Sequence, residues 1–568
     1  MRKVLAALLF LTSCLSLAAA GPQTSRGTGG AVAAAEENAA RVGVEILSKG
    51  GNAADAAVAV AFALAVTWPE AGNIGGGGFW ISRDARGRLL VIDFRETAPR
   101  AARPDLFIQP GPGGKPPSST EGPLASGVPG SIAGLALAHR RLGHLPWKTV
   151  VDPAVRLARD GFVVSEVVSR SIAEEKNRLA RDSETARVFL PDGAPPAPGS
   201  TLKQPDLART LAMVRDHGAD GFYRGAVARQ IEEGQQRDGG LISRGDLGRY
   251  QALARAPVKF RFGPAEVFTT PAPSSGPVLA EMAMLGGFLG LDRLKANDVA
   301  SAHLLAEIEK RAFRDRNQFL GDPGFGGVRQ ALMTDPVRLK ALAASIDPRR
   351  ATPSQGLAAA EPERPTTTHF SVADASGSVV SVTTTLNDSF GNARVAPGLG
   401  FLWNNEMDDF TTHPGRKNLY GLVQGEVNRV APGKRMLSSM CPSIAVEGGK
   451  NVLVWGSPGG STIPTTNLQV MLNALLRGLS PADAVAAPRF HQQDFPDRIE
   501  YEEGRFDSAW VEGLERMGHT VAVRVTDSEP HGAVLGRVHA IFLGSDGVAQ
   551  AVADPRSGGV GLVVRPSR

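Results

Sequence analysis

The 568-residue chain is 42% hydrophobic and 21% charged, the balance of a soluble globular protein with a large core. This mixed composition excludes collagen, coiled coil and bulk disorder, and the 66 glycines and 40 prolines indicate many turns. The net charge of +5 is small for this length, and no Lys/Arg run exceeds a pair. With 6% aromatic residues, these features argue against a dedicated nucleic-acid-binding protein.

Residues 1–20 have the pattern of an export signal. Arg2 and Lys3 precede an apolar run that ends at Leu17, and small residues follow up to Ala20. The run is shorter than the roughly 20 residues that cross a bilayer, and no later stretch is apolar enough for a membrane span. We therefore expect removal of residues 1–20 and a periplasmic or secreted protein.

The two cysteines bear on export and on stability. Residues 11–14, which end at Cys14, resemble a lipoprotein signal, so anchoring at Cys14 is the alternative to cleavage after Ala20. The apolar run continues past Cys14, which favours cleavage after Ala20. Cys441 would then be the one remaining cysteine, and the exported protein would contain no internal disulfide.

Helical patterns dominate the chain up to about residue 345. The Ala-rich stretch 30–66 predicts two helices, which Gly50 and Gly51 separate. A glycine run at 75–78 leads into a predicted hairpin, and a loop rich in Pro, Gly and Ser follows at 101–125. The strands expected in this part of the chain are 79–83, 89–94, 258–262 and 265–269.

Strand patterns dominate after residues 347–366, a segment without periodicity that we interpret as a flexible linker. The expected strands are 368–373, 378–386, 399–403, 442–447, 451–455, 520–524 and 538–543. Helices are expected at 464–477 and 507–517. Helices in the first part and strands in the second are compatible with layered α and β structure.

Common catalytic motifs do not occur in the sequence. It has no Gly-x-Ser-x-Gly elbow, no phosphate-binding Gly-Lys-Ser/Thr and no His-Glu-x-x-His. We accordingly expect neither a metal nor a cofactor. Cys441 as a nucleophile has little support, because a lone Cys is more often a small buried apolar residue.

The segment after the linker predicts a hairpin with two hydroxyls at its open end. If residues 375–377 form a three-residue turn with Gly377 at positive φ, Asp374 pairs with Ser378. Counting outward, Thr367 then lies opposite Thr385. Two hydroxyls at one open end form a base-and-nucleophile geometry if the chain is cut before Thr367. Read without other information, however, Thr-rich strands indicate only good β formers.

A family resemblance favours the catalytic interpretation. Residues 367–372 resemble the processing site of the γ-glutamyltranspeptidases, in which the first Thr of Thr-Thr-His becomes a new N-terminus. Matching segments occur in order along nearly the whole chain. They are residues 46–56, 75–79, 93–96, 127–130, 273–276, 321–323, 386–387, 404–410, 437–440, 456–461 and 554–557.

The resemblance implies an α/β fold of the N-terminal nucleophile hydrolase type, a four-layer αββα arrangement with two stacked, mostly antiparallel sheets. It also implies self-cleavage between Thr366 and Thr367 into a large subunit, residues 21–366, and a small subunit, residues 367–568, which together form one domain. The expected activity is γ-glutamyl transfer and glutathione hydrolysis. Thr367 would carry the γ-glutamyl group and pass it to water, an amino acid or a dipeptide.

The same resemblance assigns roles to individual residues. Thr385 would support the nucleophile Thr367, and Gly459 and Gly460 would direct backbone N–H groups at the oxyanion. Contacts to the donor α-carboxylate and α-ammonium would come from Arg95, Asn387, Glu406, Asp409, Ser438 and Ser439. Arg95 would bind the carboxylate bidentately. His369 is expected to be structural.

Residues 411–435 resemble the lid of those relatives in which a Tyr screens the donor pocket, and Tyr420 occupies that position. A lid favours small γ-glutamyl donors over polymers.

Two other functions stay open. One is an acylase of the same fold, which cleaves cephalosporin or glutaryl amides. The other is an unprocessed, inactive homologue that only binds γ-glutamyl compounds or partners.

Overall fold

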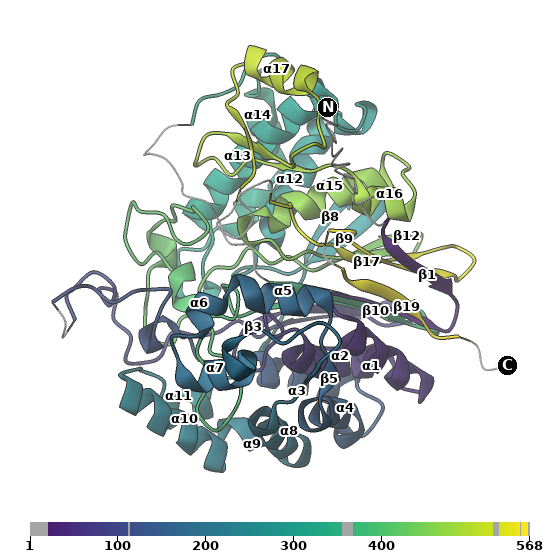
Figure 1. Ribbon diagram of the computed structural model, residues 1–568. Helices are drawn as coiled ribbons and strands as arrows, with labels where there is room; N and C mark the ends of the chain where they lie inside the picture. Colours follow the sequence, from purple (N-terminus) through teal and green to yellow (C-terminus); the bar gives the residue numbers. More distant parts are fainter. Residues whose placement is uncertain (1–20, 112–113, 355–366, 526–532, 557, 566–568) are drawn as a thin grey trace, which may run out of the picture.

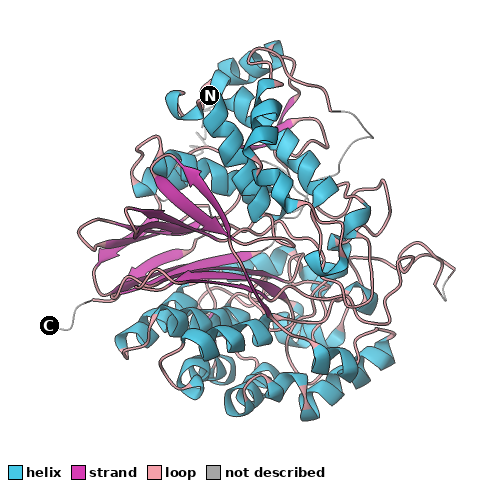
Figure 2. Ribbon diagram, turned by 180° about the vertical axis from the view of Figure 1, so that it is seen from behind, coloured by secondary structure: helices cyan, strands magenta, loops and turns pink. Residues whose placement is uncertain are grey.

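The computed structural model describes residues 21–111, 114–354, 367–525, 533–556 and 558–565. Within these residues, two seven-stranded sheets are stacked face to face, and helices cover the outer face of each sheet (Figures 1 and 2). The expected four-layer αββα architecture is confirmed. None of the described helices has the length and apolar character needed to cross a membrane.

Neighbouring strands are antiparallel throughout both sheets. One sheet has the order β1 (Gln23–Gly27), β18 (Ala549–Ala553), β17 (His539–Leu543), β13 (Lys450–Trp455), β12 (Ser443–Glu447), β9 (Ala265–Thr269) and β8 (Val258–Phe262). The other has the order β19 (Val560–Val563), β2 (Gly30–Ala34), β10 (Thr368–Asp374), β11 (Val379–Thr385), β3 (Gly77–Arg83), β4 (Leu89–Asp93) and β7 (Leu253–Arg255). Smaller sheets join β14 (Phe490–His491), β15 (Ile499–Tyr501) and β16 (Val521–Val523), and β5 (Phe162–Val163) and β6 (Thr201–Leu202).

The helices divide between the two outer layers by their order in the chain (Figure 1). Below the sheet of β10 lie α1 (Glu37–Ser48), α2 (Ala53–Thr67), α3 (Ser131–Leu142), α4 (Trp147–Asp160), α7 (Ser183–Phe189), α8 (Pro205–His217), α9 (Asp220–Tyr223), α10 (Gly225–Asp238) and α11 (Arg244–Arg249), while α5 (Glu166–Glu174) and α6 (Lys176–Leu179) lie at the level of the strands. Above the other sheet lie α12 (Gly276–Leu289), α13 (Val299–Phe319), α14 (Pro336–Ala344), α15 (Ile463–Leu475), α16 (Pro481–Ala486) and α17 (Ser508–Arg516).

Small and β-branched residues allow the two sheets to pack closely. Ala31, Ala373 and Ala551 lie between them together with larger residues such as Ile444 and Val454, all buried. Two larger clusters fill the spaces between each sheet and its helices. Burial of apolar area on this scale stabilises the fold, and Cys441, the one cysteine among the described residues, is free.

Both sheets combine strands from before and after the segment 355–366. β10 and β11 lie at the centre of their sheet, between β2 on one side and β3 on the other. In the other sheet, β12 pairs with β9. Because the two parts share both sheets, cleavage before Thr367 would leave the fragments held together by backbone ladders and a common core.

Most expected elements are confirmed, including both hairpins and the strands at 258–262 and 265–269. Two predictions were wrong. Residues 30–34 form β2 rather than helix, because they pair with β10 and β19 on both sides. Residues 399–403 form a loop with one isolated bridge, Val395 to Leu402, instead of a strand.

The beginning of the expected linker is held in place. Thr352 accepts a hydrogen bond from Lys310 at 2.6 Å and donates its N–H to Glu307 at 3.0 Å. The N–H of Ser354 donates to Asp497 at 2.7 Å. Residues 355–366, and with them Thr366, lie outside the described residues, as does the expected export signal with Cys14.

Candidate active site

The open end of the β10–β11 hairpin brings Thr367 to Thr385. Thr368 pairs with Thr384 and Ala373 with Val379, which is the predicted register. The turn closes through the Gly377 N–H to the Asp374 carbonyl, with Gly377 at φ 88°. As a result the hydroxyl oxygens of Thr367 and Thr385 lie 3.4 Å apart, and both residues are buried.

The glycine run at 75–78 allows β11 and Glu96 to approach the start of β3 closely. A Cβ on Gly76 would overlap the carbonyl oxygen of Thr385, and one on Gly78 would overlap that of Thr383. A Cβ on Gly77 would come within 2.5 Å of Glu96 Oε2. The run is therefore a packing feature that sets Thr385 and Glu96 at one site, which agrees with its place before a strand rather than a helix.

Arg95 follows β4 and is fully buried among carboxylates. Its guanidinium forms ion pairs with Asp409, with Glu406 at 2.7 Å and with Glu96 at 3.4 Å. The Glu406 contact is at ion-pair distance without hydrogen-bond alignment. Glu406 and Asp409 belong to the 3-10 helix η6 (Glu406–Asp409), so its single turn directs two carboxylates at one arginine.

Burial shifts the proton affinities of these groups. It raises the pKa of Glu96 to about 7 and that of Glu406 well above its usual 4.5, although the charge of Arg95 acts in the opposite direction. The pKa of Asp409 is raised for the same reason. Three buried carboxylates thus surround one arginine, and burial favours the protonated form of each. Sequence reasoning had not selected Glu96.

Ser438 and Ser439 lie directly after the backbone that touches Arg95. The guanidinium donates to the carbonyls of Met436 at 3.3 Å and Leu437 at 3.4 Å. The N–H of Ser438 donates to the Pro273 carbonyl at 2.7 Å, which fixes the segment against the loop before α12. Both serines therefore follow directly on the backbone that contacts the guanidinium, and their carboxylate-binding role stays a prediction.

Asn387 and Tyr420 connect Thr385 to residues 411–435, the expected lid. Asn387 is at φ 79°, and its N–H donates to the Thr385 hydroxyl at 2.9 Å. The Tyr420 hydroxyl donates to the Asn387 carbonyl. Tyr420 is 4% exposed and in turn accepts from Gln493 at 3.0 Å, so the lid covers the site from the side of Thr385.

The lid also reaches the carboxylate cluster. Asn418 donates to Asp409 Oδ1 at 3.3 Å and accepts from the Tyr420 N–H at 3.0 Å. The side chain of Asn387 donates to the carbonyl of Asn405, which precedes Glu406, at 3.1 Å. A continuous series of contacts therefore joins Thr367 to Arg95, and the predicted residues come together at one place.

Gly459 and Gly460 form a tight corner before α15. They are at φ 139° and 56°, and Gly460 begins the 3-10 helix η8 (Gly460–Thr462). A Cβ on Gly460 would lie 2.5 Å from the ring of Tyr420. Only glycine fits this corner without strain, and it faces the lid residue that contacts Asn387.

Neither His369 nor Cys441 competes for the role of nucleophile or base. His369 contacts the Thr383 hydroxyl at 2.8 Å and that of Ser371 at 3.1 Å, and burial lowers its pKa well below 6.5. Cys441 is buried, and burial raises the pKa of its thiol to about 12. Among the described residues no cluster of His, Cys, Asp and Glu is suited to a metal ion.

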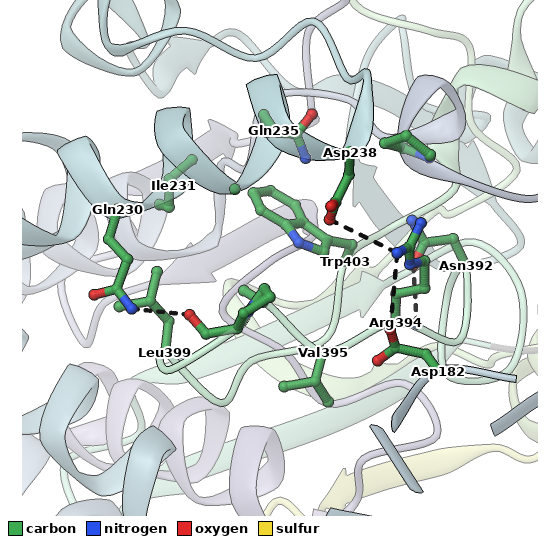
Figure 3. A pocket seen from close by; sticks show the side chains of 14 residues that line it. Asp182, Gln230, Ile231, Gln235, Asp238, Asn392, Arg394, Val395, Leu399 and Trp403 are labelled. Carbon is green, nitrogen blue, oxygen red and sulfur yellow. Dashed lines mark hydrogen bonds and ion pairs between the residues drawn. The ribbon is translucent and has the colours of Figure 1, made fainter. Parts of the chain in front are cut away.

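A separate pocket lies between α10 and the loop that ends at Trp403 (Figure 3). Arg394 points across it and pairs with Asp182 and Asp238, each at 3.7 Å. None of the residues expected to be catalytic or to bind the substrate lines this pocket. The candidate site is therefore the one at the open end of the hairpin.

The stacked sheets between helical layers, with a Thr at the head of a central strand, define the fold of the N-terminal nucleophile hydrolases. Over residues 39–564 the chain matches the family described as γ-glutamyltranspeptidase. The glutathione hydrolase proenzyme of Escherichia coli (strain K12) is 41% identical over 577 residues, 98% of each chain. That of Pseudomonas aeruginosa is 41% identical over 574 residues, 98% of this chain and 99% of the other. The chain belongs to the γ-glutamyltranspeptidase family.

Solved structures agree with the fold. Cephalosporin acylase from Bacillus halodurans aligns with a TM-score of 0.82 over 96% of this chain and 97% of its own, at 23% identity, which shows the fold alone. γ-Glutamyltranspeptidase from Pseudomonas nitroreducens, complexed with L-DON, is 39% identical, with a TM-score of 0.53 over 57% of this chain and 96% of its own.

Proposed function

We propose that this protein is a self-processing γ-glutamyltransferase and glutathione hydrolase, which acts through a γ-glutamyl ester of Thr367. The relatives at 41% identity are glutathione hydrolase proenzymes. The observation that carries the proposal is the contact series from the Thr367 hydroxyl to the buried Arg95 cluster. It places a nucleophile and groups for both ends of an α-amino acid in one enclosed site.

Processing comes first. The Thr367 hydroxyl attacks the carbonyl carbon of Thr366, the acyl group moves from nitrogen to oxygen, and water hydrolyses the ester. This releases the α-amine of Thr367, which then takes the proton of the same hydroxyl during catalysis. Thr385, 3.4 Å away, holds the hydroxyl in position.

Turnover uses the same hydroxyl. It attacks the γ-carbonyl of the donor, the C–N bond breaks, and the proton passes to the leaving amine, which is cysteinylglycine when the donor is glutathione. Gly459 and Gly460 supply backbone N–H groups for the oxyanion. Water or an amino-acid or dipeptide amine then attacks the ester and restores the free Thr367.

Donor recognition separates this function from that of an acylase. Arg95, Ser438 and Ser439 would bind the α-carboxylate, while Asn387, Glu406 and Asp409 would bind the α-ammonium. A glutaryl amide lacks the ammonium, and a 4-aminobutyryl amide lacks the carboxylate. Either amide would leave some of these buried groups without a partner. This costs about 1–3 kcal/mol of binding free energy for each such group.

The test compares kcat/KM for γ-glutamyl, glutaryl and 4-aminobutyryl p-nitroanilides. We expect the γ-glutamyl compound to be preferred over each of the others by at least 10-fold. A preference for the glutaryl compound would favour the acylase function. A protein that stays one chain and turns over none of the three would favour the binding homologue.

The lid would also select donors by their size. Tyr420 covers Gly460 and contacts Asn387, so we propose that it restricts the site to small donors such as glutathione. In Tyr420→Ala, kcat/KM for a poly-γ-glutamyl donor relative to glutathione should rise several-fold. Unchanged relative values would contradict this role.

We further propose export to the periplasm or the medium after removal of residues 1–20, and an association of large and small subunits from one precursor. The charged and apolar pattern of residues 1–20 supports export, and the shared sheets support the association. Sequencing the N-termini of the purified protein should give Gly21 and Thr367. A lipid-modified N-terminus at Cys14 would favour a lipoprotein.

A further inference from the structure

A second buried arginine lies behind the donor site. Arg316 is on α13 and is 1% exposed. Its guanidinium donates to Ser275 Oγ at 3.1 Å, Ser439 Oγ at 3.2 Å and Gln424 Oε1 at 3.3 Å. It also donates to the side chain of Asn317 at 3.2 Å. All four acceptors are neutral oxygens.

The charge environment of Arg316 differs from that of Arg95. Arg95 has three carboxylates within 3.4 Å, whereas among the described residues no carboxylate forms an ion pair with Arg316 within 4.0 Å. Burial lowers the pKa of Arg316 to about 10, while the charge of Asp409 acts to raise it and that of Arg95 to lower it. An arginine stays charged when buried, so Arg316 contributes a positive charge that no carboxylate of the described residues neutralises by direct contact.

The contact with Ser439 fixes the direction of a hydroxyl proton. A serine hydroxyl has one proton to donate, and Ser439 Oγ already accepts from Arg316. Its proton is therefore directed away from the guanidinium. Ser275 has the same arrangement, because it accepts from Arg316 and donates to the Ser438 carbonyl at 2.6 Å. Arg316 thus holds the Ser438 backbone in position through Ser275, and it also fixes the direction of the Ser439 hydroxyl proton.

Arg316 also reaches the ammonium side through the lid. Gln424, which accepts from Arg316, donates to the Asp409 carbonyl at 2.9 Å. Asn428 donates to the same carbonyl at 2.7 Å and to Gln424 Oε1 at 3.0 Å. The neighbouring Gly425 N–H donates to the Asn317 carbonyl at 2.8 Å, so α13 holds the base of the lid as well.

We propose that Arg316 is a positioning residue for the α-carboxylate of the donor, which directs the Ser439 hydroxyl at that carboxylate and adds a positive charge that Arg95 alone does not supply. This inference rests on the proposed function. It makes recognition of the carboxylate depend on two arginines, one in contact with the donor and one acting through Ser439.

The test measures KM and kcat for γ-glutamyl p-nitroanilide and inhibition constants for L-glutamate and 4-aminobutyrate, which differ in the α-carboxylate. For Arg316→Met we expect KM and the L-glutamate inhibition constant to rise about 10-fold or more, with kcat and 4-aminobutyrate inhibition within about 3-fold. Arg314→Met, on the same helix and 39% exposed at its side chain, is the matched control and should leave all values unchanged.

A double-mutant cycle identifies the route. If Arg316 acts through Ser439, then Arg316→Met should add little to the KM of a Ser439→Ala variant. Full additivity, or equal loss for glutamate and 4-aminobutyrate, would overturn the inference.

Arg316→Lys keeps the charge but loses the planar guanidinium, so its KM should lie between those of wild type and Arg316→Met. A wild-type KM would also overturn the inference. If the wild type itself fails to distinguish glutamate from 4-aminobutyrate, the proposed function fails instead.

Discussion

The hydroxyl oxygen of Thr367 lies 3.4 Å from that of Thr385, across the open end of one hairpin. The turn at the other end sets this distance, because the register runs without a bulge from Ala373–Val379 to Thr368–Thr384. A one-residue slip would move every side chain to the other face of the sheet. The geometry of the proposed nucleophile is therefore a property of the strand pairing.

Removal of the Thr385 hydroxyl should slow both processing and turnover. Thr385→Val keeps the shape of the side chain but removes one hydrogen bond of the Thr367 hydroxyl and one of the Asn387 N–H. Loss of hydrogen bonds of about 1 kcal/mol each predicts at least a 10-fold lower rate. Thr385→Ser should retain most activity, and Ser376→Ala, at the exposed turn, should retain all of it. Equal rates for Val and Ser would contradict this role.

Loss of Arg95 should affect both binding and stability. Charge-assisted hydrogen bonds of about 1.5–3 kcal/mol predict a 10- to 100-fold lower kcat/KM for γ-glutamyl donors in Arg95→Lys. Arg95→Ala should also lose about 3–5 kcal/mol of unfolding free energy, because buried carboxylates lose their cation.

The exposed pair of Arg88 and Asp84 provides the stability control for Arg95. Arg88 is 73% exposed at its side chain, so Arg88→Ala should cost less than about 1 kcal/mol. Denaturant unfolding of both variants measures the difference. Equal costs would show that the charges around Arg95 are not coupled as the structure indicates.

Gly460 and Gly478 have similar φ angles but different surroundings. Comparing their alanine variants therefore separates the effect of a steric contact from that of backbone strain. Gly460 is at φ 56° and Gly478 at φ 65°. An alanine at 460 would meet the Tyr420 ring at 2.5 Å, whereas one at 478 would meet no atom within 4 Å. We expect Gly460→Ala to lower kcat at least 10-fold and Gly478→Ala to leave it unchanged, with a strain cost of about 1–2 kcal/mol in each. Similar kcat values would exclude Gly460 from the site.

The raised pKa of Glu96 predicts how the stability of the protein changes with pH. Its pKa is about 7 in the folded protein and near 4.5 when unfolded, so between these values the folded state binds more protons. The free energy of unfolding should therefore fall as pH rises from about 4.5 through 7. In Glu96→Gln this contribution is absent, and the fall between pH 5 and pH 8 should be smaller than in wild type. Urea unfolding across that range measures it, with the exposed Glu121→Gln as control. An identical pH dependence in Glu96→Gln would show that Glu96 is not buried among these charges.

Short sequence patterns correctly predicted the elements whose formation depends on neighbouring residues. Alternation gave the β10–β11 hairpin, and Gly377 fixed its turn, so the position of Thr385 opposite Thr367 followed from counting. The Ala-rich residues 30–34 were predicted as helix because alanine is a strong helix former. Pairing on both sides with distant strands overrides that preference, and no short window contains those partners.

The candidate site was predicted mainly by family resemblance, and the supporting residues were missed. Arg316 and Glu309 lie on α13 among many other charged residues, a pattern typical of a solvated surface helix, yet both are buried. Only the packing of α13 between α12 and α17 shows that the charges face inward. Glu96 was missed for a similar reason, because next to Arg95 it indicates only a local ion pair.

The most direct test of the central claim is the intact mass of purified wild type and of Thr367→Ala. We expect wild type to give two chains that meet between Thr366 and Thr367, and the variant to remain one chain. A wild type that stays whole, or a variant cut at the same bond, would contradict the assignment of Thr367 as the self-cleaving nucleophile.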